Sequence, residues 1–132
     1  MDQWMASEFP GETSRYGELA YTSDLRPIDR EADLVVEGIA EDMAVKVGLW
    51  EALPSAASRG AIFCSSTSGL SISEMGKLSG FPAQVIGTHF WNPPHLMPLV
   101  EVVVGAGTTE ETVKTTLRFC TNIGKTAGTR QY

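Results

Sequence analysis

The 132-residue sequence predicts an α/β fold in which a mostly parallel sheet is flanked by helices. Two observations predict it. Short apolar runs, typical of buried strands, alternate along the chain with stretches whose apolar residues recur at helical spacing. The composition, 42% hydrophobic and 20% charged, is that of one globular domain. Strands that alternate with helices of this length are typical of βαβ units, in which successive strands run parallel.

The first half of the chain contains two predicted strands with a helix between them. The run ADLVVEGI, residues 32–39, is a short buried strand. Residues 41–57 are predicted to be helical because their apolar residues form one stripe: Met43, Val47, Trp50 and Leu53. The run GAIFCSS, residues 60–66, is the second strand, so this part of the chain reads as one βαβ unit.

Two further helices are predicted, over residues 71–80 and 108–124. Each begins with a pair in capping-box spacing and ends at a glycine, which are ordinary start and stop signals. The capping pairs are Ser71 with Glu74 and Thr108 with Glu111, and the glycines are Gly80 and Gly124.

Two strands, Gln84–Phe90 and Val100–Val104, lie between these helices and are separated by an Asn-Pro-Pro bend. In mostly parallel sheets, chemistry takes place outside the carboxyl ends of the strands, where loops meet helix N-termini. The segments EGIAED, SSTSG and HFWNPP all fall at such ends. We therefore expect these three segments to build one site.

Charge and composition exclude several classes of function. The net charge is −6, from 10 basic and 16 acidic side chains, so no general basic field is available for nucleic acid. The first residues are acidic and lack an apolar core, unlike a signal peptide, and no run approaches the ~20 apolar residues of a membrane helix. Cys64 and Cys120 lie in apolar surroundings without metal-ligand spacing. We expect a cytoplasmic protein with buried thiols and no metal.

His89 and Glu101 are the first candidates for chemistry. A histidine at the end of an apolar strand is more often a hydrogen-bonded structural residue, but a glutamate within LVEVVV is costly to bury without a partner. The bend between the two strands would bring Glu101 toward His89. A carboxylate on one imidazole nitrogen fixes the tautomer and makes the other nitrogen a better base. Ser68 and Asn92 could orient a substrate oxygen, although either alone is typically a turn or cap residue.

Four segments resemble the 3-hydroxyacyl-CoA dehydrogenases, in their NAD-binding domain. They are ADLVVEGIAEDMAVKVGLWEAL, SSTSGLSISEM, VIGTHFWNPPHLMPLVEVVVGAGTTEETV and NIGKT. The most specific motif is H-F-x-N-P-x(3)-M-x-L-V-E-V, which begins at His89. The resemblance extends over roughly Leu19 to Thr126 and implies a partial Rossmann-like sheet, half of a doubly wound fold.

The resemblance also implies an activity and its residues. The family uses NAD to oxidise (S)-3-hydroxyacyl-CoA to 3-ketoacyl-CoA, with His89 as the base and Glu101 as its orienting partner. Ser68 and Asn92 match hydrogen-bonding residues near the substrate oxygen and the nicotinamide. Glu41 and Lys46 match positions that contact the ribose and nicotinamide side of the cofactor.

The sequence departs from the family pattern at both ends. The family begins with a Gly-rich βαβ half that holds the pyrophosphate, and no such segment precedes Leu19. The nearest substitute, GAGTTE at Gly105, has Glu110 in place of the third glycine, and glutamates repel phosphate. The family also ends in a helical domain that supplies much of the acyl-CoA pocket. We expect an N-terminal arm over residues 1–18, a truncated NAD-binding domain over 19–132, and a naturally short protein.

Three functions remain open on these grounds. The first is a 3-hydroxyacyl-CoA dehydrogenase that is incomplete alone; the second is a non-catalytic nucleotide or acyl-CoA binding or assembly module. The third is a thioester enzyme that uses the His-Glu pair without NAD. Without the Gly-rich half, the strand at 32–39 becomes a sheet edge, so we expect the arm to cover it or two chains to pair as a dimer.

Overall fold

The computed structural model describes residues 20–131, and within them five strands form one sheet in the order β1-β2-β3-β4-β5. The strands are β1 (Leu34–Glu37), β2 (Ile62–Ser65), β3 (Val85–Phe90), β4 (Leu99–Val104) and β5 (Thr126–Gln131). All neighbours run parallel except β3 and β4, which are antiparallel. The predicted mostly parallel α/β sheet is confirmed, while the proposed arm lies outside the described residues.

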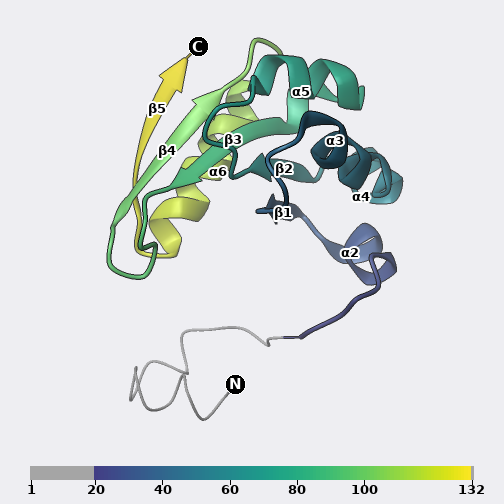
Figure 1. The fold of residues 1–132 in the computed structure, drawn as a ribbon, viewed down its shortest axis with the longest axis horizontal. Coiled ribbons are helices and arrows are strands. Elements are labelled where there is room, and N and C mark those ends of the chain that lie inside the picture. Colours follow the sequence, from purple (N-terminus) through teal and green to yellow (C-terminus); the bar gives the residue numbers. More distant parts are fainter. Residues whose placement is uncertain (1–19, 132) are drawn as a thin grey trace.

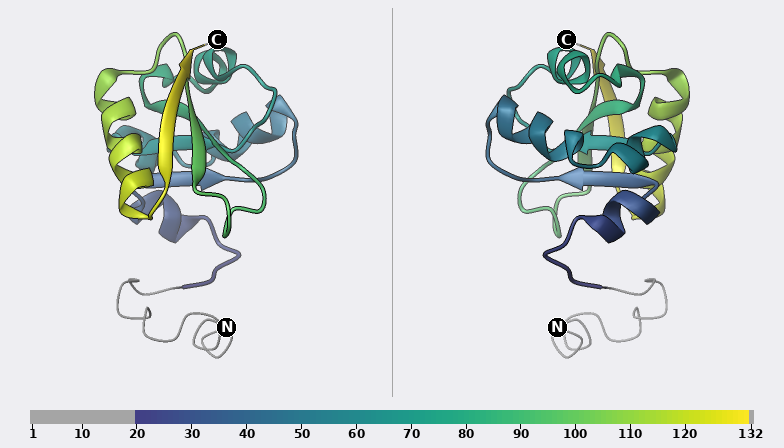
Figure 2. Two further views of the ribbon diagram at one scale, coloured as in Figure 1. Left: turned by 90° about the vertical axis from the view of Figure 1, so that its left-hand side faces the viewer. Right: turned by 90° about the vertical axis from the view of Figure 1, so that its right-hand side faces the viewer.

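Helices cover both faces of the sheet (Figures 1 and 2). They are α2 (Arg26–Glu31), α3 (Met43–Glu51), α4 (Pro54–Ser58), α5 (Ile72–Ser79) and α6 (Glu110–Asn122), with a 3₁₀ turn η2 (Pro82–Gln84) before β3. Helices α3, α4 and α5 pack on one face, and α6 packs on the other. Among the described residues, no helix has the length and apolar character needed to cross a membrane.

Alternate strand residues feed two separate cores because successive side chains of a strand point to opposite faces. On the α3–α5 face, Phe63 lies between Trp50 and Phe81, with ring centroids 5.8 and 4.8 Å away. On the α6 face, Cys64 packs in the same core as Cys120. Both cysteines are free and fully buried, as the sequence predicts.

Local capping explains where α5 begins and ends and where α6 begins. Ser71 accepts a hydrogen bond from the Glu74 N–H at 3.2 Å, and α5 ends at Gly80, whose φ of 83° is left-handed. Both predicted signals are thus confirmed. The α6 cap is Thr109, one residue later than predicted, because the Thr108 hydroxyl instead donates to the Val85 carbonyl at 2.6 Å.

The structure differs from the predicted elements at three places. The single helix expected over 41–57 is divided into α3 and α4, since Pro54 has no N–H to continue the first helix. Helix α2 and strand β5 were not predicted from the sequence. Strand β5 pairs with β4 along its whole length, so the sheet extends one strand further than expected.

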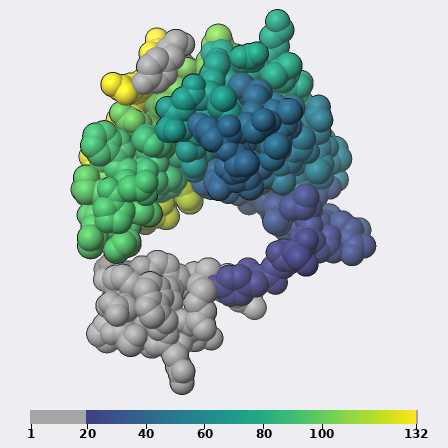
Figure 3. All heavy atoms as spheres, in the orientation of Figure 1, coloured from purple at the N-terminus to yellow at the C-terminus, as the bar shows by residue number. Residues whose placement is uncertain are grey.

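The strand directions bring several strand ends together along one side of the sheet, and this side can hold a site. Strands β1, β2 and β3 are parallel, so their carboxyl ends share an edge, and β4 starts at the same edge after the bend at 91–98. The Lys125 ammonium holds this bend by donating to the carbonyls of Met97, at 2.9 Å, and Pro94. In the space-filling view the bend is the green surface at the left of the described body, with α3 in blue to its right (Figure 3).

Candidate active site

A pocket of about 330 Å³ opens at this edge of the sheet. Its walls come from the segment after β1, the start of α3, the loop after β2, and the end of β3 with the bend. The lining residues are Gly38, Ile39, Glu41, Lys46, Ser66, Ser68, His89, Phe90 and Asn92. Every predicted site residue except Glu101 lines it, which agrees with the expectation that the three strand-end segments build one site.

Glu101 lies behind the pocket, directly against His89. The two residues are opposite partners in the antiparallel β3–β4 register, and His89 Nδ1 is 3.1 Å from Glu101 Oε2. Both side chains are partly exposed. Because Nδ1 faces the carboxylate, Nε2 is the imidazole nitrogen available to another group. The bend therefore brings the pair together as predicted, and the pair has the geometry of an oriented general base.

A histidine, an arginine and an indole act on the Glu101 carboxylate. The hydrogen bond from His89 lowers the pKa of Glu101 most, with further lowering from the Arg130 charge and the Trp91 side chain. Arg130 Nη1 lies 3.1 Å from Glu101 Oε1, the oxygen that does not face His89. Glu101 is thus ionised at neutral pH and can stabilise a protonated imidazole.

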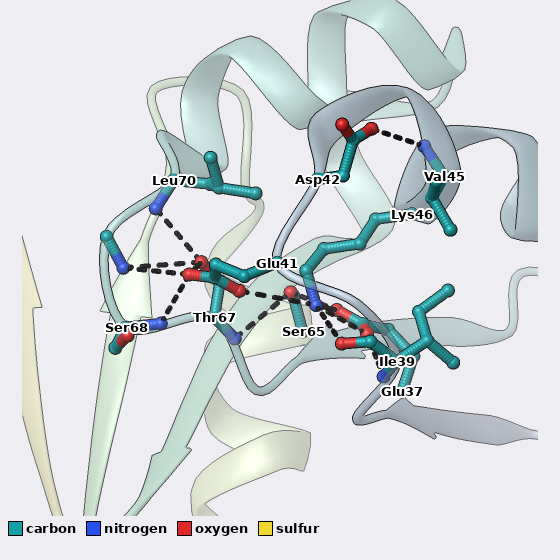
Figure 4. Close-up of polar contacts among 11 residues, drawn as sticks. Glu37, Ile39, Glu41, Asp42, Val45, Lys46, Ser65, Thr67, Ser68 and Leu70 are labelled. Carbon is teal, nitrogen blue, oxygen red and sulfur yellow. Dashed lines mark hydrogen bonds and ion pairs between the residues drawn. The ribbon is translucent and has the colours of Figure 1, made fainter.

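Glu41 holds the loop that carries Ser68 (Figure 4). Its Oε1 accepts hydrogen bonds from the Thr67 hydroxyl at 2.6 Å, the Ser68 N–H at 3.1 Å and the Gly69 N–H at 3.3 Å. The Thr67 hydrogen bond is the main reason that the pKa of Glu41 is lowered. The carboxylate remains half-exposed at the pocket, so it is both a loop anchor and an available hydrogen-bond acceptor.

Lys46 is engaged mainly within the protein. Its side chain is 1% exposed, and its ammonium donates to both oxygens of the buried Glu37, at 2.9 and 2.8 Å, and to the Ile39 carbonyl at 3.3 Å. Glu37 also accepts from the Ser65 hydroxyl. Glu41 Oε2 lies 3.5 Å from the same ammonium. A buried polar network therefore joins the ends of β1 and β2 to α3 (Figure 4).

Sequence reasoning missed three members of this network, Glu37, Ser65 and Thr67. Glu37 carries the same signal as Glu101, an acid within an apolar strand, and that signal could have identified it. Ser65 and Thr67 have no comparable signal, because serine and threonine are common in strand-end turns. Ser68 and Asn92 are exposed and line the pocket, Ser68 on the loop held by Glu41 and Asn92 on the bend held by Lys125.

The segment GAGTTE does not contribute to this pocket. Since β4 is antiparallel to β3, its carboxyl end and Gly105 lie at the opposite edge of the sheet. A Cβ at Gly107 would lie 2.5 Å from Pro82 Cβ, and one at Gly105 would lie 3.0 Å from Ile72 Cγ2. These glycines therefore allow close packing against η2 and α5, and Glu110 in the first turn of α6 disfavours a phosphate there.

The doubly covered, mostly parallel sheet with a pocket at its strand ends defines a Rossmann-like NAD-binding domain. The chain belongs to the 3-hydroxyacyl-CoA dehydrogenase NAD-binding domain family, whose model matches residues 10–129. This match extends beyond the 19–126 region of resemblance at both ends. Domains of this family bind NAD.

Individual relatives agree with this membership. A probable 3-hydroxybutyryl-CoA dehydrogenase of Deinococcus radiodurans is 39% identical over 110 residues, which are 83% of this chain and 39% of that protein. One of Bacillus subtilis is 42% identical over 96 residues, 73% of this chain and 33% of that protein. The crystal structure of 3-hydroxybutyryl-CoA dehydrogenase from Escherichia coli K12 matches with a TM-score of 0.78 at 31% identity, covering 83% of this chain and 23% of that one. The chain thus spans less than half the length of these relatives.

The pocket fits one end of NAD. An ionised, half-exposed carboxylate at Glu41 suits ribose hydroxyls, and the backbone at Gly38 has open space where a Cβ would project. Residues 20–131 provide no comparable site for the pyrophosphate of NAD. At the start of α3, which is the nearby helix N-terminus, Glu41 and Asp42 would repel phosphate. In the same part of the chain, no cluster of three or more His, Cys, Asp or Glu is placed to hold a metal ion.

Proposed function

We propose that this chain carries the proton-transfer and nicotinamide-ribose part of an NAD-dependent site that oxidises (S)-3-hydroxyacyl-CoA to 3-ketoacyl-CoA. The observation that supports this most is the His89–Glu101 pair, 3.1 Å apart, at the back of a pocket that also presents Ser68 and Asn92. Membership of the dehydrogenase family supports the same reaction.

In this proposal His89 is the base. Its Nδ1–H donates to Glu101, so the lone pair of Nε2 accepts the proton of the substrate 3-hydroxyl. The ionised Glu101 stabilises the imidazolium that forms. The Ser68 hydroxyl and the Asn92 amide donate hydrogen bonds to the substrate oxygen. NAD held beside Glu41 and Lys46 would supply the acceptor for the hydride that leaves C3.

In this proposal Glu41 and Lys46 contribute to cofactor binding in different ways. Glu41 accepts a hydrogen bond from the ribose while its other bonds keep the Ser68 loop in place. Lys46 contacts the nicotinamide side from the wall of the pocket, with most of its hydrogen-bonding capacity used by Glu37. We therefore expect substitution of Lys46 to affect folding as well as cofactor affinity.

We propose further that residues 20–131 do not complete the site and that two chains associate. Among residues 20–131 no phosphate-binding turn meets the pocket, so NAD affinity should be low; every 1.4 kcal/mol lost is tenfold. Within those residues β1 pairs in the sheet with β2 alone, and Val36 on β1 is exposed, so the unpaired edge of β1 is a candidate pairing surface. Sedimentation of the purified chain over a concentration series tests association: a single monomer species throughout would refute it.

Turnover with acetoacetyl-CoA and NADH tests the reaction, with His95 as an internal control. His95 is exposed on the bend and lies outside the pocket lining. We expect His89→Ala to lose at least about a hundredfold in rate and His95→Ala to keep the wild-type rate. Equal wild-type and His89→Ala rates would refute the assigned base.

A non-catalytic binding module is the second candidate, and the absence of a phosphate-binding turn at the pocket, among the described residues, favours it. Energy transfer from the tryptophans to NADH separates the two functions. Saturable NADH binding that acetoacetyl-CoA strengthens, without turnover, would identify the binding module. Binding with His89-dependent turnover would identify the dehydrogenase.

A further inference from the structure

The two carboxylate oxygens of Glu101 have different partners. Oε2 faces His89 Nδ1 and Oε1 faces Arg130 Nη1, each at 3.1 Å. We propose that Arg130 is a positioning residue for the His89–Glu101 pair: its guanidinium fixes the carboxylate orientation and offsets part of the carboxylate charge that acts on His89. This inference rests on the proposed function, because it concerns the same base.

The sheet register explains how an arginine on the last described strand reaches the pair. Glu101 on β4 lies opposite Gly128 on β5, and Arg130 is two residues further along, so its side chain projects from the same face. Gly128 has no side chain, and a Cβ built there would meet nothing within 4 Å. Glu101 therefore meets no side chain from its direct partner on β5, and the Arg130 guanidinium reaches its Oε1 from two residues further along.

The other charged side chains near the pocket have partners of their own. Lys46 is paired with the buried Glu37, and Glu41 is held by the Thr67 loop and lies 3.5 Å from the same ammonium. Among residues 20–131, Arg130 is the charged side chain that contacts the pair, through Glu101 Oε1. Arg130 is 57% exposed, so solvent screens its charge and the effect should be modest.

The test is an NMR titration of the imidazole, which needs no turnover. The chain has two histidines, so His95→Gln identifies the His89 signals. Loss of the Arg130 charge leaves the full Glu101 charge to stabilise imidazolium. We expect Arg130→Gln to raise the midpoint of the His89 titration by about half a pH unit, roughly threefold in proton affinity. The Nδ1–H proton signal should also broaden as the carboxylate loses its fixed orientation.

Two variants make this outcome specific. Arg130→Lys restores the charge but not the fork geometry, so it should recover most of the midpoint without sharpening the Nδ1–H signal. Lys114→Gln removes an exposed cation paired with Glu110 on α6 and should leave both signals as in the wild type. Identical midpoints and Nδ1–H signals in wild type and Arg130→Gln would overturn the proposal.

The same measurement separates this inference from the proposed reaction. A shifted midpoint in a protein without turnover would support the role of Arg130 while the dehydrogenase assignment fails. If turnover is present, the acidic limb of the pH–rate profile should move by the same amount as the NMR midpoint. Turnover with an unmoved midpoint would remove Arg130 from the mechanism and leave the His89 assignment intact.

Discussion

Lys46 places an ammonium inside the protein, where only a carboxylate makes it tolerable. Its side chain is 1% exposed and both Glu37 oxygens accept from it. Pairs of this kind contribute little net stability over an apolar pair, but removing one partner leaves an uncompensated buried charge. A substitution of Lys46 that is made to test cofactor binding will therefore also lower the stability of the fold.

We expect Lys46→Met to destabilise the fold by about 3–5 kcal/mol, because Glu37 is left buried without a counter-ion. The double variant Glu37→Gln with Lys46→Met should recover much of that loss. Urea unfolding of the four proteins in the cycle measures both effects. A double variant as unstable as Lys46→Met alone would show that the pair is not coupled as the structure indicates.

At the level of single residues, the sequence predicts the His89–Glu101 pair but not the buried Glu37–Lys46 pair. His89 and Glu101 stand on either side of a marked bend, so their approach follows from the local sequence. Glu37 meets Lys46 only because the chain turns from β1 into α3. The helical pattern of apolar residues does not indicate whether a lysine at position 46 is buried or exposed. Arg130 could not be assigned because its strand was not predicted.

Among the elements, β3 depends on a glycine at its centre. A Cβ at Gly87 would lie 2.8 Å from Val103 Cβ and 3.1 Å from Ile72 Cδ1, so β3, β4 and α5 meet at this point. We expect Gly87→Ala to cost about 1–3 kcal/mol of stability. Gly48→Ala is the matched control: it lies within α3, has nothing within 4 Å of its Cβ, and should stabilise by about 1 kcal/mol or less.

Chemical denaturation of both alanine variants checks this pair of expectations. The difference between them isolates the close contact at Gly87, since both substitutions add one methyl group. Equal midpoints for the two variants would mean that α5 moves away from the sheet at no cost. That outcome would also weaken the interpretation of Gly105 and Gly107 as packing glycines.

The elements that escaped prediction lack a local pattern. Strand β5, TAGTRQ, is mostly exposed and has no apolar alternation, so it becomes a strand through pairing with β4. Helix α2 has six residues and no buried side chain; Asp29 on it accepts from the N–H groups of Ser55, at 2.8 Å, and Ala56, at 3.0 Å. Contacts distant in sequence decide both elements, whereas periodicity and caps predict β1 to β4, α5 and α6.

For the molecule as a whole, several carboxylates set the acid limit of stability. Their folded pKa values are lowered: that of Asp29 chiefly by the Ala56 N–H, that of Glu41 by Thr67, and that of Glu101 by His89. A group whose folded pKa is depressed contributes stability that is present above its unfolded pKa and is lost as the pH falls through the folded value.

We therefore expect a stability plateau above about pH 5 and a steady fall below about pH 4. Urea midpoints measured from pH 7 to pH 2.5 check the sign and the window. Asp29→Asn removes one contribution, so it should lower stability at pH 7 and reduce the slope of the acid limb. A stability that rises on acidification would contradict the assigned pKa shifts.

The buried thiols of Cys64 and Cys120 allow opening of the protein to be measured by the rate of thiol labelling. The chain has two cysteines, one on β2 and one on α6, and both are fully buried. Burial raises the pKa of Cys64 to about 12, so its reactive thiolate is nearly absent in the closed protein. A thiol reagent can then react with Cys64 at a useful rate only when the core around the two thiols opens. The labelling rate therefore measures how often the protein opens. If NADH slows the labelling, NADH binds to the closed protein, and this is detected without a change in absorbance and without turnover.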